Sequence, residues 1–537
     1  MRSPLPKRNR LIAIGAAIFL LAALTLRVQY ILHSQVAVDE FEHVHAAWLV
    51  SLGQRPYVDF FEHHPPFFYL AAALPLRLLE PGFDALIQLR FAALGAFVAT
   101  GVLVGLLVRR TATREAVLAA AVFLLANTLL FQVGMRLYLD TFAAPFVVLA
   151  ALMLARERTR LSDVYVATIA LGIAGLITQK TAMALPAYAI LLIAKLRRDP
   201  ATNHRPWKAV LGGAVAGAAT CAGILVLTLG ADGLAAFWRD AIALNAGWRA
   251  RRFPWPELYH VVRHDGFYFL LALGGVAMLG TDLVRRRSPL HRTTPMLFLV
   301  SLALGIVLLP VVWEEYFVLL LPFLCAVAGI ALARAVHAIE QRHAYGLLIP
   351  IALAFLVGAS GWRLTFSSAH FPAWAALMIM CAWLALALHA FMRWRRRSAP
   401  GWMWLSLPAI AYALVLQTEE TDASRNDAQR ERVDFVMRTT KPNEPYFDGY
   451  SGYGVFRPHA YRYWLLHDEM QLMLGGEELQ RGVLAALRQT RPPLVAADAW
   501  TATLPSAVQT YLRETYAPSR YAEIWQRRSA TSAPDRH

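Results

Sequence analysis

Apolar runs of membrane-spanning length recur between residues 11 and 417 of this 537-residue chain. A helix needs about 20 apolar residues to cross the hydrocarbon core of a bilayer, because each residue advances it by only about 1.5 Å. Charged residues make up 16% of the chain, whereas about 25% is usual in soluble proteins. The sequence therefore predicts a polytopic α-helical membrane protein rather than a large soluble enzyme.

The apolar runs divide into about 13 expected transmembrane helices. The first run follows a basic start and is longer than a signal-peptide core, so we expect it to be retained. Together the runs define an expected transmembrane domain over residues 1–417. The helices are expected at 11–32, 86–108, 115–133, 141–155, 162–178, 182–195, 209–230, 266–284, 294–312, 316–336, 346–362, 373–392 and 402–417.

Basic residues are concentrated in short segments between these runs, and they set the expected orientation. About half of the 52 Lys and Arg fall in cytoplasmic segments when the N-terminus is placed in the cytoplasm. Short basic loops remain cytoplasmic, so the net charge of +16 reports topology, and nucleic acid is not an expected partner. Arg outnumbers Lys by 47 to 5 and no organelle signal is visible, which favours a bacterial inner (plasma) membrane.

An odd number of spans places residues 418–537 outside the cytoplasm. Acidic and basic residues nearly balance in this region, and no apolar run is long enough to span a membrane. We expect a periplasmic or extracellular α/β domain with a helix at 428–439 and a strand at 493–497. An alternation of aromatic residues and Gly at 446–454 suits either a glycan-binding platform or a packed, turn-rich strand pair.

The first outer loop, residues 33–85, has an unusual density of ionisable side chains. Such groups beside a membrane are costly unless they face water, a metal ion or a substrate. Residues 39–52 and 67–79 have the pattern of two helices lying in the membrane interface. Five carboxylates and four histidines lie within 26 residues: Asp39, Glu40, Glu42, Asp59 and Glu62, with His43, His45, His63 and His64.

Two interpretations of this loop remain open from the residues alone. Asp39 and Glu40 could be catalytic acids, or they could stabilise a helix N-terminus, where carboxylates are favoured. The histidines could hold a divalent metal ion such as Mg, Mn or Zn, or they could be wet interfacial residues, because their spacing matches no strong zinc motif.

The order of several motifs resembles the GT-C membrane glycosyltransferases, specifically the protein O-mannosyltransferase and lipid A aminoarabinose transferase group. An Asp-Glu pair at 39–40 follows the first span, then G-x-x-P-Y at 53–57 and an acidic residue before Pro-Pro at 62–66. Further similar elements follow at 136–141, 175–181 and 315–322. The resemblance covers about residues 1–335 by motif and the remainder by architecture, and it implies a GT-C fold with an outer C-terminal domain.

The resemblance also implies a reaction. The enzyme would be an inverting hexosyl- or pentosyltransferase that moves a sugar from a polyprenyl-phosphate donor to an extracytoplasmic lipid or glycan acceptor, with no nucleotide cofactor. Such a reaction contributes to lipid glycosylation or to a cell-envelope glycan. It needs a carboxylate as general base and cations that stabilise the departing lipid phosphate.

Carried over position by position, the resemblance assigns roles to several residues, and charge placement adds others. Asp39 is the expected base, with Glu40 and Asp140 as further catalytic acids and Asp39 and Asp140 as candidate metal ligands. Glu62, His43 and His64 are expected to orient the acceptor or a metal ion. Donor phosphate would meet Lys180 and Arg136, together with Arg249, Arg251 and Arg252, which interrupt the positive-inside trend. Glu315 and Tyr316 are expected to bind sugar hydroxyls.

Alternatives remain for these cations and for the function. Lys180 and Arg136 could be snorkelling helix-end cations. The three arginines at 249–252 could equally belong to an interfacial helix that touches anionic lipids without selectivity, and Glu315 and Tyr316 could pair with those arginines instead of binding a sugar. His64 occupies the place of a lysine common before Pro-Pro in the aminoarabinose enzymes, and the sugar-binding repeats of protein O-mannosyltransferases are absent, which disfavours a protein acceptor. A transporter or flippase of lipid-linked sugars is the main competing function, although transporters usually place ionisable groups at mid-membrane.

Overall fold

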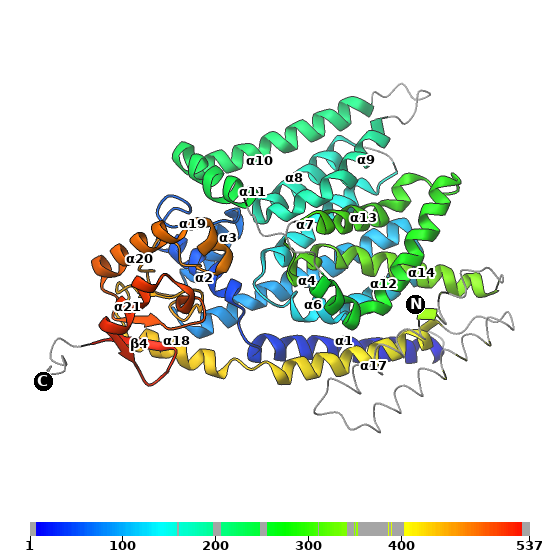
Figure 1. The fold of residues 1–537 in the computed structure, drawn as a ribbon. Helices are drawn as coiled ribbons and strands as arrows, with labels where there is room; N and C mark the ends of the chain where they lie inside the picture. The colour runs from blue at the N-terminus through cyan, green and yellow to red at the C-terminus, as the bar shows by residue number, and fades with distance from the viewer. Residues whose placement is uncertain are drawn as a thin grey trace, which may run out of the picture.

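The computed structural model is mostly helical, with a small sheet near the C-terminus (Figure 1). It describes residues 7–157, 160–196, 206–247, 255–309, 311–340 and 402–528, with isolated positions between 341 and 401. The expected spans at 346–362 and 373–392 therefore lie almost entirely outside the described residues.

Several helices are long and apolar enough to cross a membrane. Among the described residues there are five such helices, or six if α1 and α2, which are bent by 73° relative to each other, form one broken span. This agrees with a polytopic membrane protein, while the expected number of 13 remains a prediction. The long helical elements are α1 (Lys7–His33), α4 (Phe83–Thr111), α10 (Pro206–Phe237), α12 (Trp255–Val284), α13 (Thr294–Leu308), α14 (Leu321–Glu340) and α17 (Trp402–Ala423).

Shorter helices occupy the rest of the membrane region. They are α5 (Arg114–Ala126), α6 (Thr128–Gln132), α7 (Leu139–Leu154), α8 (Leu161–Ile177), η1 (Gln179–Ala184), α9 (Leu185–Leu196), η2 (Trp238–Ala243), α11 (Leu244–Ala246), η3 (Leu290–Thr293) and η4 (Glu314–Leu319). The single helix expected at 115–133 is broken at Asn127, whose extended backbone ends α5. The Asn127 side chain accepts a hydrogen bond from Leu130 N, and Asp265 accepts others from Thr128 N and Leu129 N, so α6 starts as a separate helix.

Close packing in the bundle depends on small residues. Helix α10 lies along α8, with Gly213 and Gly217 four residues apart at the contact. A Cβ atom at Gly217 would come within 2.6 Å of Thr168 Cβ, so only glycine permits this approach. Small residues at this spacing allow membrane helices to pack closely. Elsewhere α7 packs against α4 and α8, α5 packs against α14, and α1 runs beside α17 (Figure 1).

The first outer loop forms two short helices, α2 (Val38–Ser51) and α3 (Phe67–Leu76), which pack against each other. Both stand where the sequence predicts helices. They lie where the bundle meets the C-terminal elements, which gather at one end of the molecule (Figure 1). This junction is where most of the candidate site residues converge.

Helix α17 runs to Ala423, past the boundary expected between 417 and 418. A four-stranded sheet of order β1-β2-β4-β3 follows, with β1 parallel to β2 and the other pairs antiparallel. Helix α18 and strand β2 stand at the positions expected for a helix and a strand. The elements are α18 (Asp427–Thr439), β1 (Tyr446–Phe447), α19 (Asp468–Leu474), α20 (Gly476–Thr490), β2 (Leu494–Ala496), η6 (Thr501–Thr503), α21 (Ser506–Thr515), β3 (Tyr516–Pro518) and β4 (Ile524–Arg527).

Candidate functional site

Asp39 and Glu40 are neighbours in the first turn of α2, but their environments differ. Both oxygens of Glu40 are engaged: Arg90 donates to each of them, at 2.8 and 2.6 Å, and the backbone N–H groups of Ala37 and Leu137 donate as well. The Glu40 side chain is fully buried. Glu40 therefore ties the start of α2 to α4 and to the segment before α7, and no lone-pair direction remains for a substrate.

Asp39 is only partly buried. Its Oδ1 accepts a hydrogen bond of 2.5 Å from the hydroxyl of Tyr450, which lies in the C-terminal region. In the described part of the chain, no residue donates a hydrogen bond to Oδ2. Asp39 therefore combines a fixed orientation with one oxygen available to a substrate, whereas Glu40 has neither exposure nor a free oxygen.

A largely buried cation lies between the carboxylates at the start of α7 and in η4. Lys180 Nζ is 2.7 Å from Asp140 Oδ2 and 3.8 Å from Glu315 Oε1, and it lies over the ring of Tyr316 at 3.6 Å from the centroid. The structure thus brings together Asp140, Lys180, Glu315 and Tyr316, four residues that the sequence predicts for the site.

The charges in this cluster influence one another. Burial raises the pKa of Glu315 to about 8, Lys180 opposes this rise, and the charge of Asp39 adds to it. Burial alone would lower the pKa of Lys180, but its pKa lies above the ordinary value because Asp140 and Tyr316 favour the charged form. Asp39 is therefore electrostatically linked to this cluster, and Lys180 remains positively charged.

Arg136 precedes α7 and is held by hydroxyl groups. Its guanidinium donates to Tyr30 Oη at 3.1 Å and lies 3.5 Å from Tyr138 Oη. Among the described residues no carboxylate forms a direct ion pair with it. The Glu40 carboxylate acts on Arg136 only through space, whereas Lys180 forms a direct ion pair with Asp140.

A second cluster combines carboxylates and imidazoles from α2 and from the turn before α3. One ligand atom from each of four residues, Glu42, Glu62, His63 and His64, lies within 4.8 Å of the other three. Glu42 Oε1 is buried, accepts no hydrogen bond from the described residues and is 3.3 Å from His63 Nδ1. Two buried carboxylates at such close range repel each other unless a proton or a cation lies between them.

The histidines of the first outer loop divide into two pairs. Burial lowers the pKa of His64 to about 3, with Lys180 contributing, so its imidazole is neutral, as a metal ligand must be. His43 packs instead among the rings of His64, Phe68 and Tyr69. His45 points away, with Nδ1 2.9 Å from the backbone carbonyl of Val455. His43 therefore lies beside the carboxylate–histidine cluster without being one of its four residues, whereas the ring of His45 is engaged by the C-terminal region.

Three of the predicted site residues lie outside the described part of the chain, and two residues that contact the site were not predicted from the sequence. Arg249, Arg251 and Arg252 lie outside the described residues. Arg90 and Tyr450 escaped prediction because each contacts the Asp39-Glu40 pair from a distant part of the sequence, 50 and 411 residues away. A buried arginine inside an apolar helix was the available signal for Arg90, since such a charge requires a partner.

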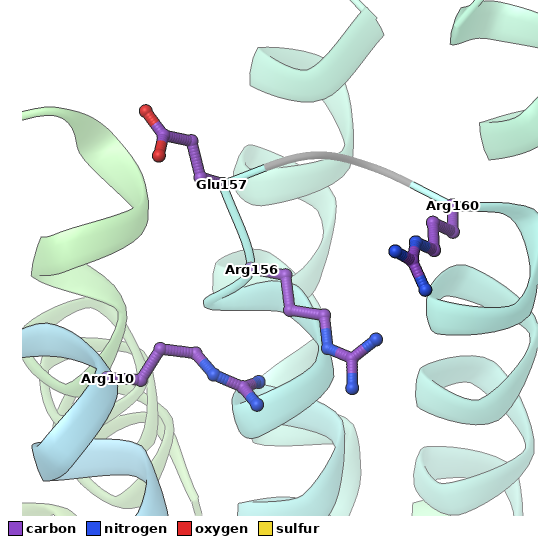
Figure 2. Close-up of a pocket in the computed structure, with 4 residues that line it drawn as sticks. All are labelled: Arg110, Arg156, Glu157 and Arg160. Atoms are coloured by element: carbon purple, nitrogen blue, oxygen red, sulfur yellow. The ribbon is translucent and has the colours of Figure 1, made fainter.

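A separate pocket of about 470 Å³ is lined by Arg110, Arg156, Glu157 and Arg160 (Figure 2). It lies at the end of α7 opposite to Asp140, about 24 Å away along a helix of this length. Its charges are partly satisfied internally, because Arg156 pairs with Asp163 at 2.6 Å and Arg110 donates to the Leu152 carbonyl. The segments that line it are among those expected to face the cytoplasm, so this pocket is distinct from the candidate site.

Comparisons with known proteins agree with this fold. Residues 63–224 match the family model described as dolichyl-phosphate-mannose-protein mannosyltransferase. This segment begins at the carboxylate–histidine cluster and contains Arg136, Asp140 and Lys180. No curated protein sequence matches the chain.

Solved structures match over most of the chain. ArnT from Cupriavidus metallidurans, in the apo state and bound to undecaprenyl phosphate, matches with a TM-score of 0.61, 15% and 16% identity, and coverage of 97% of this chain and 100% and 99% of those chains. An Archaeoglobus fulgidus oligosaccharyltransferase matches with a TM-score of 0.54 and 12% identity, and the match covers 97% of this chain and 75% of that one. Arabinosyltransferase EmbB from Mycobacterium smegmatis matches with a TM-score of 0.52 and 16% identity, and the match covers 85% of this chain and 43% of that one.

The chain therefore has the fold of the GT-C membrane glycosyltransferases, which confirms the resemblance seen in the sequence. The family-model match over residues 63–224 and the ArnT matches agree with the group to which the sequence motifs are similar. Together with the helices that are long and apolar enough to cross a membrane, this indicates a membrane protein with that fold.

Proposed function

We propose that the protein is an inverting glycosyltransferase that moves a sugar from a polyprenyl-phosphate donor to an extracytoplasmic lipid or glycan acceptor. The observation that supports it best is the placement of a half-buried Asp39, with one unengaged oxygen, beside a buried cluster that contains Lys180. ArnT, which has the same fold over almost the whole chain, was solved with undecaprenyl phosphate bound, in agreement with a donor of this class.

Asp39 acts as the general base in this proposal. Its Oδ2 takes the proton of the acceptor hydroxyl as that oxygen forms a bond to the anomeric carbon, and the bond from this carbon to the phosphate oxygen breaks. Attack from the side opposite to the leaving phosphate inverts the configuration. Glu40 contributes as a positioning residue, because its bonds to Arg90 hold the first turn of α2 in place.

Lys180 and Arg136 meet the phosphate that leaves with the isoprenoid. Charge-assisted hydrogen bonds to a developing phosphate charge are the strongest contacts available to such a site. Arg136 is suited to this role because its present partners are hydroxyls. Asp140 keeps Lys180 oriented through their ion pair. Arg249, Arg251 and Arg252 remain proposed contacts for the same phosphate on the strength of the sequence alone.

Glu315 and Tyr316 line the site from η4 and are proposed to bind sugar hydroxyls. Because the pKa of Glu315 is raised to about 8, its carboxyl group is protonated at neutral pH and offers both a donor and an acceptor. A sugar hydroxyl has the same dual character, so the two groups are complementary.

A divalent metal ion is proposed at the carboxylate–histidine cluster of Glu42, Glu62, His63 and His64. Two imidazoles with two carboxylates favour Zn²⁺ over Mg²⁺ or Mn²⁺. The Archaeoglobus fulgidus oligosaccharyltransferase was solved in complex with Zn and sulfate. A cation would supply positive charge that offsets the two buried carboxylates and would fix the 62–66 turn against α2. A metal held by Asp39 and Asp140 has weaker support, since Asp140 is already paired with Lys180.

The proposed setting is a bacterial inner membrane, with the N-terminus in the cytoplasm and residues 418–537 forming an extracytoplasmic domain. A transporter of lipid-linked sugars is the competing function. The clustering of charges at the ends of α7, α8 and α2 supports the enzyme, because transporters concentrate such groups in broken helices at mid-membrane.

The test is mass spectrometry of envelope lipids and glycans from cells that lack the protein, complemented with the wild-type chain, Asp39→Asn or Asp59→Asn. Asp59 is the matched control, a more exposed carboxylate of the same loop that pairs with Arg55. We expect a species one sugar heavier with the wild type and Asp59→Asn, and its loss with Asp39→Asn. If normally expressed Asp39→Asn restored this species, Asp39 would not be the base. If the lipid-linked sugar moved between leaflets and no new glycosylated product formed, the protein would be a transporter.

A further inference from the structure

The hydroxyl of Tyr450 bridges two carboxylates of α2. It lies 2.5 Å from Asp39 Oδ1 and 3.0 Å from Glu42 Oε2. A phenol has one proton to donate, so the two carboxylates share it, with the shorter contact to Asp39. One residue of the C-terminal region therefore contacts both the proposed base and a residue of the carboxylate–histidine cluster.

The segment that carries Tyr450 is held closely against α2. Gly452 has a φ of +75°, and a Cβ atom there would overlap the ring of Phe41, so glycine is needed both for the backbone conformation and for the approach. His45 Nδ1 contacts the Val455 carbonyl at 2.9 Å. These contacts fix the distance between the 449–455 segment and α2.

A further contact between the C-terminal region and the first outer loop lies outside this segment. Arg462 donates to the Tyr57 carbonyl at 2.8 Å and approaches Asp240 at 3.3 Å. The region is thus held to the loop at several points, and Tyr450 occupies a defined place between them.

Tyr450 itself is held in place before any substrate arrives. The backbone N–H groups of Gly449 and Tyr450 donate to Asp498 Oδ2, at 3.0 and 3.1 Å, and the ring packs edge-on against Trp500. A tyrosine phenol is ordinarily protonated at neutral pH. The hydroxyl therefore keeps its proton and acts as a donor.

We infer that Tyr450 is a positioning residue through which the C-terminal region completes the catalytic centre. By engaging Oδ1 of Asp39 it leaves Oδ2 as the oxygen that faces the acceptor, and through Glu42 it links the orientation of the base to the carboxylate–histidine cluster. This inference rests on the proposed role of Asp39. It gives the C-terminal region a function in catalysis that does not depend on whether it binds glycan.

Tyr450→Phe is the direct test, because it removes the hydroxyl and keeps the ring. The matched control is Tyr446→Phe, another buried tyrosine, which lies in β1 just before this segment and whose hydroxyl hydrogen-bonds to neither Asp39 nor Glu42. Full-length variants in nanodiscs are assayed with lipid extract of the deletion strain, which supplies donor and unmodified acceptor. We expect the kcat of Tyr450→Phe to fall about 10- to 100-fold, the effect typical of losing a group that orients a functional ligand.

The half-saturating extract concentration is expected to change by less than about threefold, because Tyr450 touches the base rather than the substrate. The inference would be overturned if Tyr446→Phe lowered kcat as much as Tyr450→Phe does. It would also be overturned if Tyr450→Phe changed only the half-saturating extract concentration and left kcat unchanged. Gly452→Ala gives a second route if Tyr450→Phe folds poorly: it displaces the segment from α2 without removing the hydroxyl, and unchanged kcat in that variant would also count against the inference.

A double variant separates failure of this inference from failure of the proposed function. If Tyr450 acts through Asp39, adding Tyr450→Phe to Asp39→Asn should cause no further loss. Full activity of Asp39→Asn would reject the proposed base, whatever Tyr450→Phe does. Inactive Asp39→Asn with fully active Tyr450→Phe would reject the role of Tyr450 alone.

Discussion

Arg90 and Glu40 form a fully buried, two-point ion pair that joins the N-terminal part of α4 to the first turn of α2. The two contacts, Nε to Oε2 and Nη2 to Oε1, measure 2.8 and 2.6 Å. Arg90 also donates to the carbonyls of Ser34 and Gln35. The chain between α1 and α2 is therefore folded around one guanidinium, and the position of Asp39 depends on it.

Arg90→Lys and Glu40→Gln should both be strongly destabilising. Breaking a buried pair leaves an uncompensated charge, which costs about 3–5 kcal/mol, and lysine cannot reproduce the two-point geometry of arginine. The measurement is thermal unfolding of the purified protein in detergent. The control is Arg430→Gln, which breaks the solvent-exposed pair with Asp84 and should cost less than about 1 kcal/mol. Equal effects at both sites would contradict this account of Glu40.

Lys180→Met should abolish most transfer activity. The variant removes the cation proposed for the donor phosphate and leaves Asp140 buried without its partner. We expect a loss of about 100-fold or more in kcat/KM, comparable to the loss of a group that stabilises transition-state charge. Lys180→Arg should retain part of the activity, and Lys208→Met, at an exposed lysine, should retain all of it. Activity of Lys180→Met close to wild type would indicate a helix-end cation without a role in the reaction.

The carboxylate–histidine cluster should hold about one divalent ion per chain, measured by elemental analysis after gel filtration. Glu62→Gln and His64→Ala each remove a ligand atom, and each should lower the retained metal and weaken affinity by about 10-fold or more. His33→Ala, an exposed histidine at the end of α1, is the control. Equal metal content in all variants would reject the site, whatever their activity.

Stability should depend on pH through Glu315. The pKa of this group in the folded chain is about 8, above the ordinary value of 4.5, so the folded state binds its proton more tightly than the unfolded state. The free energy of unfolding should therefore decrease as pH rises from about 4.5 to 8, and this part of the pH dependence should be absent in Glu315→Gln. Identical slopes for the two proteins, measured by denaturant titration between pH 5 and 8, would contradict the assignment.

Much of the fold follows from the pattern of apolar residues. The runs at 86–108, 141–155 and 162–178 are expected as helices and correspond to α4, α7 and α8. Hydrophobic length is a local property, so it can be identified without knowledge of the fold. The break at Asn127 could not, because it depends on Asp265, a residue 137 positions away that accepts a hydrogen bond from Thr128 N.

The sequence by itself determined that this is a polytopic membrane protein and which loop has the dense set of carboxylates and histidines. It also singled out Asp39, Asp140 and Lys180 as candidates, because their motif order is similar to that of a known group. Only the tertiary structure decided how the environments of the two adjacent acids differ. Arg90 occupies Glu40 completely, whereas Tyr450, from the other end of the chain, orients Asp39 and leaves one oxygen available. The reason is physical: hydrogen-bond saturation and burial are set by partners that folding brings together from distant parts of the chain.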